Sequence, residues 1–150
     1  MKKPSLRAEA IIGNGDFSQV MVQCDRDESF YRFPGGTVEF GETASEAIKR
    51  ELIEEYELEI EVGKLAIVAE SIVEYDGKQR HDCTLLHWCT LPDESSIEAV
   101  IDHKEHADII LRWIPVQQLA AKPLYPEGAL QLLSSAPSFE TQHLRIRKAY

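Results

Sequence analysis

The feature that most constrains the fold is a capped, amphipathic helix in the first third of the chain. Thr43 is followed three residues later by Glu46, and a Thr-x-x-Glu pair closes the first turn of a helix through reciprocal hydrogen bonds. We therefore predict a helix over about residues 44–56. At about 100° per residue its apolar positions form one stripe that has to be buried. The stripe consists of Ala44, Ala47, Ile48, Leu52 and Tyr56.

Three acidic residues lie on the second half of this helix. Glu51 and Glu55 project into the apolar stripe and Glu54 lies at its edge. Like charges at these spacings repel one another by a few tenths of a kcal/mol in water, and partial burial raises that cost. A divalent cation held between the three carboxylates would remove the repulsion. The pattern therefore indicates a metal site.

The alternative is an ordinary solvated helix face. Glu46 has Lys49 and Arg50 within one turn, which is typical of such a face. From residue 51 to residue 61, however, there are six glutamates and no Lys or Arg. The helix alone leaves both interpretations open.

The segment around the helix closely resembles the signature of Nudix hydrolases, G-x5-E-x7-R-E-U-x-E-E-x-G-U, in which U is a bulky aliphatic residue. The matching residues are Gly36, Glu42, Arg50, Glu51, Leu52, Glu54, Glu55 and Leu58. Phe33-Pro34-Gly35-Gly36 and Trp113-Ile114-Pro115 also look like landmarks of that family, and the resemblance spans residues 5–134.

One position departs from the signature, because Glu57 stands where the last glycine is expected. A glycine there ends the helix in the left-handed conformation without a Cβ penalty. Either Glu57 adopts that conformation at a cost of about 1 kcal/mol, or the helix ends differently. Neither outcome removes a metal ligand, so the substitution affects the loop after the helix more than the chemistry.

Apolar alternation and turn residues predict an α+β protein with one domain, residues 1–150, whose residues 135–150 form a C-terminal tail. The segment from Gln142 to Tyr150 is basic, and it could cover the acidic site, contact phosphate or be mobile; mobility is the default for a chain end. Strands are predicted over 7–12, 19–24, 60–75, 80–91 and 109–114, and short helical segments over 116–121 and 127–134. The resemblance implies that these elements form a Nudix α/β/α sandwich around a mixed sheet.

The resemblance also implies an activity. The chain is expected to be a Mg²⁺-dependent pyrophosphohydrolase that cleaves a diphosphate linkage in a nucleoside di- or triphosphate, or in another nucleoside diphosphate derivative, by metal-activated water. Mn²⁺ is expected to substitute for Mg²⁺, because both prefer hard oxygen ligands. Glu51, Glu54 and Glu55 are the implied metal ligands, and one of them or a later glutamate is the general base. Arg50 is expected to orient a ligand carboxylate, because Glu54 lies one turn away.

Further site residues are predicted outside the helix. Several Nudix enzymes take an additional acid from the loop before the last strand, where Glu105 is our choice and a solvated loop is the alternative. His103 and His106 are a weaker candidate for a metal pair. Next to the glycine loop, Arg32 and Phe33 are expected to bind substrate, with core packing or plain exposure as alternatives. Gly35 and Gly36 are expected to line the diphosphate site, because a backbone without Cβ can approach a ligand closely.

Composition narrows the setting. The formal net charge of −10 argues against nucleic acid as a partner, since phosphates need a basic patch. No apolar run is long enough to cross a membrane and the start of the chain does not read as a signal peptide, so we expect a cytoplasmic protein without a membrane partner. Three cysteines without C-x-x-C spacing indicate reduced thiols. The expected oligomeric state is a monomer or homodimer.

Two other functions are compatible with a fold of this kind. The first is a noncatalytic module that senses nucleotides, which would be expected to have a damaged R-E-x-x-E-E core or an attached DNA-binding domain. The second is a diphosphate isomerase of related fold, which would need additional Cys and Glu motifs. Cys83 and Cys89 give no clear support for the isomerase.

Overall fold

A computed structural model describes residues 2–93, 98–133 and 140–150 of the chain. The N-terminal half contains β1 (Ser5–Gly13), β2 (Gln19–Asp25), β3 (Tyr31–Arg32), β4 (Gly35–Thr37), α1 (Ala44–Tyr56) and β5 (Glu61–Tyr75). The C-terminal half contains β6 (Lys78–Thr90), β7 (Val100–Asp102), β8 (Ile109–Pro115), the 3₁₀ helix η2 (Val116–Ala121), β9 (Leu124–Tyr125), α2 (Ala129–Leu133) and β10 (Gln142–Ala149).

All the strands join one mixed, ten-stranded sheet. Its main path runs β10-β5-β6-β1-β2-β3-β9, with β4 paired to β1, β8 paired to β2 and β7 paired to β8. Three of the pairs are parallel, namely β1 with β6, β5 with β10 and β3 with β9. The remaining pairs are antiparallel, and four of them, β1 with β2, β2 with β3, β5 with β6 and β7 with β8, join strands that follow each other in the chain. The predicted α+β class with a mixed sheet is therefore confirmed.

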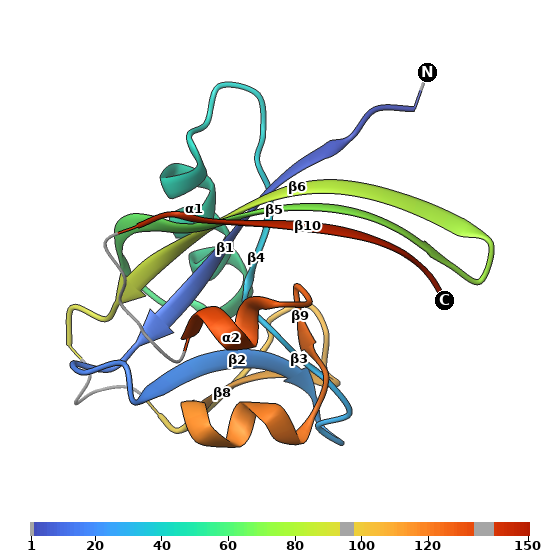
Figure 1. The fold of residues 1–150 in the computed structure, drawn as a ribbon. Coiled ribbons are helices and arrows are strands. Elements are labelled where there is room, and N and C mark those ends of the chain that lie inside the picture. Colours follow the sequence, from blue (N-terminus) through green and yellow to red (C-terminus); the bar gives the residue numbers. More distant parts are fainter. Residues whose placement is uncertain (1, 94–97, 134–139) are drawn as a thin grey trace.

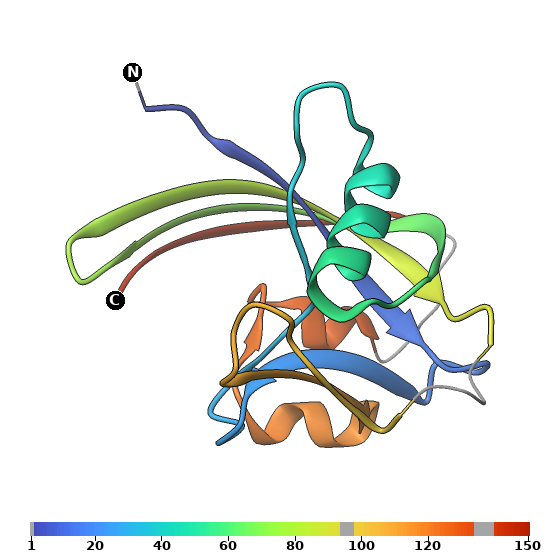
Figure 2. The same ribbon diagram turned by 180° about the vertical axis from the view of Figure 1, so that it is seen from behind.

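Helices cover both faces of the sheet, and each face has its own hydrophobic core (Figures 1 and 2). β1 serves both cores because successive side chains of a strand point to opposite faces. Ala8, Ala10 and Ile12 belong to the core with α1, whereas Ile11 belongs to the core with η2 and α2. Residues 7 and 9 share the face of Ile11, and both are charged. Charged side chains at the centre of a sheet are unusual enough to mark a functional region.

The capping box of α1 is confirmed. The backbone N–H of Glu46 donates to Oγ1 of Thr43 at 3.2 Å, and the backbone N–H of Thr43 donates to Oε1 of Glu46 at 3.3 Å. Four of the five residues of the predicted apolar stripe are buried, since Ala47, Ile48 and Leu52 are fully covered and Tyr56 is 3% exposed, whereas Ala44 is half-buried.

At its other end, α1 stops at Glu57, which adopts the left-handed conformation with φ 51° and ψ 35°. The first of the two predicted alternatives is thus the observed one. The backbone N–H of Glu57 donates to the carbonyl of Ile53 at 2.9 Å, and that of Leu58 donates to the carbonyl of Leu52 at 3.2 Å. The carboxylate of Glu57 also contacts Nζ of Lys104 at 2.9 Å. The contact between Glu57 and Lys104 ties the end of the helix to the loop between β7 and β8.

Three long strands, β5, β6 and β10, extend beyond the body of the molecule as a curved arm (Figure 1). The prediction of a mobile tail over residues 135–150 is wrong for its second part, because β10 pairs in parallel with β5 along its whole length. Leu144 and Ile146 are half-buried and alternate with exposed His143, Arg145 and Arg147. This alternation is typical of a strand with one covered face. It is a better guide to the structure of this segment than the basic composition is. Residues 134–139 lie outside the described part of the chain.

The other sequence predictions hold for the long elements. The first hairpin is present, with Ile12 opposite Met21, and the second, turning at Asp76 and Gly77, joins β5 to β6. The helical segment predicted over 127–134 is described only as α2, Ala129–Leu133. The short strands β3, β4, β7 and β9 were not predicted, since two or three residues are too few for a periodic signal. Across the described residues, no helix has the length and hydropathy needed to cross a membrane.

Candidate active site

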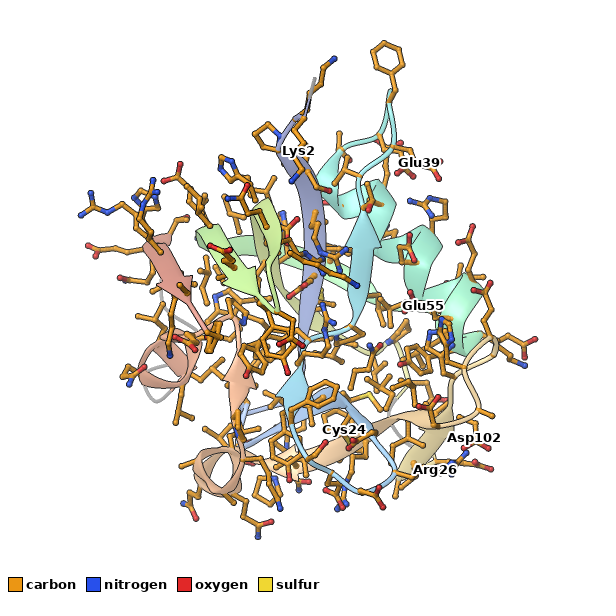
Figure 3. The ribbon with its side chains drawn as sticks, turned by 90° about the vertical axis from the view of Figure 1, so that its right-hand side faces the viewer. Lys2, Cys24, Arg26, Glu39, Glu55 and Asp102 are labelled. Carbon is orange, nitrogen blue, oxygen red and sulfur yellow. The ribbon has the colours of Figure 1, made fainter. Side chains whose placement is uncertain are left out.

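A cleft of about 580 Å³ opens between α1, the strand pair β1–β4 and the loop that precedes β8. Glu51 and Glu55 enter it from α1, and Gly35, Gly36 and Thr37 enter it from β4. Figure 3 shows Glu55 on α1, with Asp102 of β7 on the neighbouring segment. The remaining lining residues are Arg7, Gln23, Arg32, Phe33, His103, Glu105, His106, Asp108 and Ile109. Residues far apart in sequence therefore meet at the C-terminal half of α1.

Arg50 connects the carboxylates around the start of α1. Its Nε and Nη2 donate to both oxygens of Glu42 at 2.7 and 2.9 Å, and its Nη1 donates to Glu51 at 2.9 Å and to Glu54 at 3.3 Å. Nη2 also donates to the backbone carbonyl of Thr37 at 3.1 Å. The two bonds from Arg50 hold the pKa of Glu42 at about 2. A guanidinium with this many acceptors is a positioning group.

Glu51 and Glu55 lie one helical turn apart and face each other in the cleft. Burial, followed by a hydrogen bond to Glu51 and repulsion from its charge, raises the pKa of Glu55 to about 8. Oε2 of Glu55 is buried and has no hydrogen-bond partner among the described atoms. Since a buried polar atom without a partner costs about 1–3 kcal/mol, the pair is arranged for a ligand that supplies positive charge.

Gly35 and Gly36 occupy positions where a side chain does not fit. A Cβ on Gly36 would lie 2.5 Å from Cδ of Glu51, and a Cβ on Gly35 would overlap the backbone carbonyl of Ala8. The pairing of β4 with β1 brings the glycines there, because Gly36 lies opposite Ala8 in the register. The glycine pair therefore lets the backbone of β4 press against the carboxylate of Glu51.

The loop between β7 and β8 closes the other side of the cleft. The backbone N–H of Lys104 donates to the carbonyl of Glu55 at 2.7 Å, which anchors the loop on the helix. Nδ1 of buried His103 accepts the backbone N–H groups of Glu105 at 3.0 Å and His106 at 3.2 Å. The proton of a neutral imidazole then has to be on Nε2, which lies 3.8 Å from Oε2 of Glu55. Burial, and then His106, lower the pKa of His103, which favours this neutral form.

Two arginines form the cationic wall of the cleft. Nη2 of Arg7 lies 3.6 Å from Oε2 of Glu9, and Nη2 of Arg32 lies 3.9 Å from the same oxygen. Glu9 is 5% exposed, and burial raises its pKa while Arg32 and Arg7 oppose that rise. Both arginines also line a second cleft, of about 350 Å³, on the concave side of the arm. They therefore connect the carboxylate pair of α1 to a neighbouring space.

The structure separates the predicted site residues into two groups. Glu51, Glu55, Arg32, Gly35, Gly36 and Glu105 all border the cleft. Glu54 does not: its side chain is 54% exposed and contacts Arg50 beside the cleft. Phe33 takes the core alternative, because its ring is 1% exposed and packs in the core that includes η2 and α2, although the residue borders the cleft. Glu105 is exposed on its loop.

Two residues of the cleft were missed or undervalued from the sequence. Arg7 carries no local signal, and it reaches the site because β1 pairs with β4, which places Arg7 opposite Thr37. His103 was considered only as half of a metal pair with His106. Its Nδ1 accepts two backbone hydrogen bonds, which stabilise the loop, and its Nε2 faces Glu55.

The donors of the cleft suit a hard divalent cation. Carboxylate oxygens are the ligands that Mg²⁺ and Mn²⁺ prefer, and the unpartnered oxygen of Glu55 lies beside Glu51. Among the residues that the structure describes, no three Asp, Glu, His or Cys side chains are already gathered around one point. Glu51 and Glu55 would hold the cation, with other oxygens completing its shell.

Comparison with known proteins places the fold. A family model described as NUDIX domain matches residues 5–134. The chain is similar to a UDP-X diphosphatase, with 21% identity and a TM-score of 0.65 over 96% of this chain and 68% of that chain. It is also similar to an ADP-ribose pyrophosphatase from Streptococcus suis, with 17% identity and a TM-score of 0.63 over 94% and 99% of the two chains.

A third similar structure is the ORF135 protein of E. coli, with 25% identity and a TM-score of 0.56 over 92% of this chain and 96% of that one. No curated protein matches the sequence. At identities below 25%, the diphosphatase and the pyrophosphatase show the fold alone.

Proposed function

The chain belongs to the Nudix hydrolase family, and from that premise we propose that it is a pyrophosphohydrolase that uses Mg²⁺, or Mn²⁺ in its place. Its substrate is a nucleoside di- or triphosphate, or another nucleoside diphosphate derivative. The linkage that it cleaves is a phosphoric anhydride bond. The bound cation would neutralise the charge of the two phosphates and lower the pKa of attacking water.

The observation that carries this proposal is the state of Glu55. Its Oε2 is buried without a partner, and its pKa is raised to about 8 beside Glu51. A structural ion pair would have supplied that oxygen with a donor, as Arg50 does for Glu42. An incomplete shell next to a cleft open to solvent is what a cation-binding site needs before its ligand arrives.

The other residues of the cleft have separate roles. Arg50 fixes Glu51 and Glu54 by direct bonds, so it positions ligands and does not need to contact the substrate. Arg7 and Arg32 face the cleft without bidentate partners, and their guanidinium groups suit phosphate oxygens. Glu105 is an acid of the β7–β8 loop that lines the cleft and raises the pKa of Glu55 through its charge. Glu105 and Glu55 are the two candidates for the general base.

The test is hydrolysis of a panel containing nucleoside triphosphates, nucleotide sugars, ADP-ribose and dinucleoside polyphosphates. Wild type is compared with Glu55→Gln, with Mg²⁺, with Mn²⁺ and without metal. We expect metal-dependent turnover of at least one compound, reduced by about 10² to 10⁴ in the variant. Glu59→Gln removes an exposed acid without a described partner and is the matched control, which should keep full activity.

The panel also distinguishes a hydrolase from a noncatalytic module that senses nucleotides. Turnover that survives Glu55→Gln unchanged would contradict the assignment of the site. No turnover of any compound, combined with tight metal-dependent nucleotide binding, would favour the noncatalytic sensing module. The intact Arg50, Glu51 and Glu55 set argues for the enzyme, since a sensor has no need to keep a costly carboxylate pair.

A further inference from the structure

A second charged hollow lies on the arm, away from the carboxylate pair. It has a volume of about 520 Å³ and is lined by the N-terminal segment that leads into β1 and by the end of the arm formed by β5, β6 and β10. Its charged lining is mostly basic and includes Lys2, Lys3, Arg80, Arg147 and Lys148, against one acidic residue, Glu74. We call this surface the arm hollow.

The arm hollow concentrates positive charge in a chain whose formal net charge is −10. Most arginines of the body contact a carboxylate, as Arg26 does with Asp102 at 2.8 Å and Arg112 with Glu28 at 2.7 Å. Lys2, Lys3 and Arg147 have no such contact among the described residues. In a protein rich in acids, unpaired cations that meet at one hollow are unexpected, because like charges repel.

The shape and floor of the arm hollow add a second observation. Ile72 contributes to its floor on the face of the arm that carries Arg147, its register partner, and Pro4 lies at its side. The hollow is therefore amphipathic, with a cationic rim around an apolar base. Arg80 lines both this hollow and the concave cleft that Arg7 and Arg32 join to the active site. The charge of Arg80 is matched by Asp82, which accepts from its Nε, so among the described residues the unpaired cations of the hollow are Lys2, Lys3 and Arg147.

We propose that the arm hollow binds a phosphate group carried by an organic ligand. Three unpaired cations match the two charges and three acceptor oxygens of a terminal phosphate, and the apolar floor suits the body of a nucleotide. The phosphate is either the distal phosphate of a substrate whose diphosphate lies in the catalytic cleft, or that of a separate nucleotide. In both cases it binds through Lys3 and Arg147, without a metal ion.

The first test measures binding and does not depend on catalysis. Inorganic tripolyphosphate is titrated by calorimetry into protein freed of divalent metal on a chelating resin, so that the carboxylate pair repels the anion. We expect saturable binding at one site, weakened about tenfold in the double variant Lys3→Gln/Arg147→Gln. The matched control is Lys122→Gln/Arg145→Gln, which removes two exposed charges outside the hollow and should change the dissociation constant by less than about twofold.

The proposal fails if wild type shows no saturable binding, if the double variant binds as tightly as wild type, or if the control loses as much affinity. Because turnover is not involved, failure of the proposed hydrolase activity would not affect this result. A second experiment, with Mg²⁺ present, identifies the source of the phosphate by comparing the hydrolysis of ADP-ribose with that of ADP-ribose 2′-phosphate. A KM that rises in the double variant only for the phosphorylated compound identifies a substrate phosphate. An unchanged KM for both, with tripolyphosphate binding lost, identifies a separate nucleotide.

Discussion

The catalytic cleft and the arm hollow are electrostatic opposites within one small protein. In the cleft, burial, followed by the hydrogen bond to Glu51 and repulsion from its charge, raises the pKa of Glu55 to about 8. In the arm hollow, Lys3 and Arg147 line one space, and neither has an ion pair with a carboxylate among the described residues. Arg50, by contrast, contacts the carboxylates of Glu42 and Glu51, so its charge is matched within the chain. The two sites for which we propose ligands therefore share one property, since each leaves charge of one sign without a partner in the folded chain.

Of the substitutions that test this comparison, the largest effect is expected at Gly36. Replacing Gly36 with alanine places a Cβ 2.5 Å from Cδ of Glu51, so the carboxylate of Glu51 has to leave its position. We expect hydrolysis to fall by about 100-fold, since a displacement of about 1 Å in a catalytic group has that effect. Steady-state kinetics with Mg²⁺ measures the loss. Gly15→Ala, where nothing lies within 4 Å of the added Cβ, is the control and should retain activity.

The next largest effect is expected on stability, from Arg50→Gln. The side chain of Arg50 is 24% exposed, and its loss leaves Glu42 and Glu51 without their shared cation. We expect the free energy of unfolding to fall by about 2 kcal/mol, less than for a fully buried pair. Denaturation in urea measures it. Lys49→Gln, which removes an exposed charge next to it, should cost less than about 0.5 kcal/mol, and an equal loss would show that Arg50 has no special role.

Part of the Arg50 network should respond to pH. Bonds from Arg50 depress the pKa of Glu42 to about 2 in the folded state, below its value in the unfolded chain. Its stabilising effect is therefore complete above the unfolded pKa of about 4.3 and is lost as the pH falls toward 2. The difference in melting temperature between wild type and Glu42→Gln should be largest at pH 7 and smaller at pH 3. A difference that does not shrink would contradict the depressed pKa.

A smaller effect is expected where α1 ends. Glu57 has a φ of 51°, which glycine adopts freely and alanine does not. Glu57→Gly and Glu57→Ala both lose the exposed contact with Lys104, so their difference isolates the backbone. We expect the glycine variant to be more stable by about 1 kcal/mol in urea denaturation. Equal stabilities would mean that the helix end relaxes when the carboxylate is removed.

The features that could be predicted from the sequence are those set by residues close together in the chain. The capping box, the stripe of α1 and the inward direction of Glu51 and Glu55 all follow from the period of a helix, and the long hairpins follow from alternation and Gly turns. Arg7 and His103 could not be predicted, because strand pairing and a loop contact bring them to the cleft from distant positions. The strand β10 was predictable from the alternation of Leu144 and Ile146, but its basic residues suggested a mobile end.

The smallest expected effect concerns Arg147, and it sharpens the comparison most directly. If the arm hollow is incomplete until an anion binds, removing a cation from it should not destabilise the free protein, unlike the removal of Arg50. We expect Arg147→Gln to change the free energy of unfolding by less than about 0.5 kcal/mol without ligand. Tripolyphosphate at about 100 times its dissociation constant should then stabilise wild type by about 2.7 kcal/mol, and the variant by less at the same concentration. A free variant destabilised as much as Arg50→Gln would instead mean that Arg147 serves the fold, and that its charge is balanced within the chain.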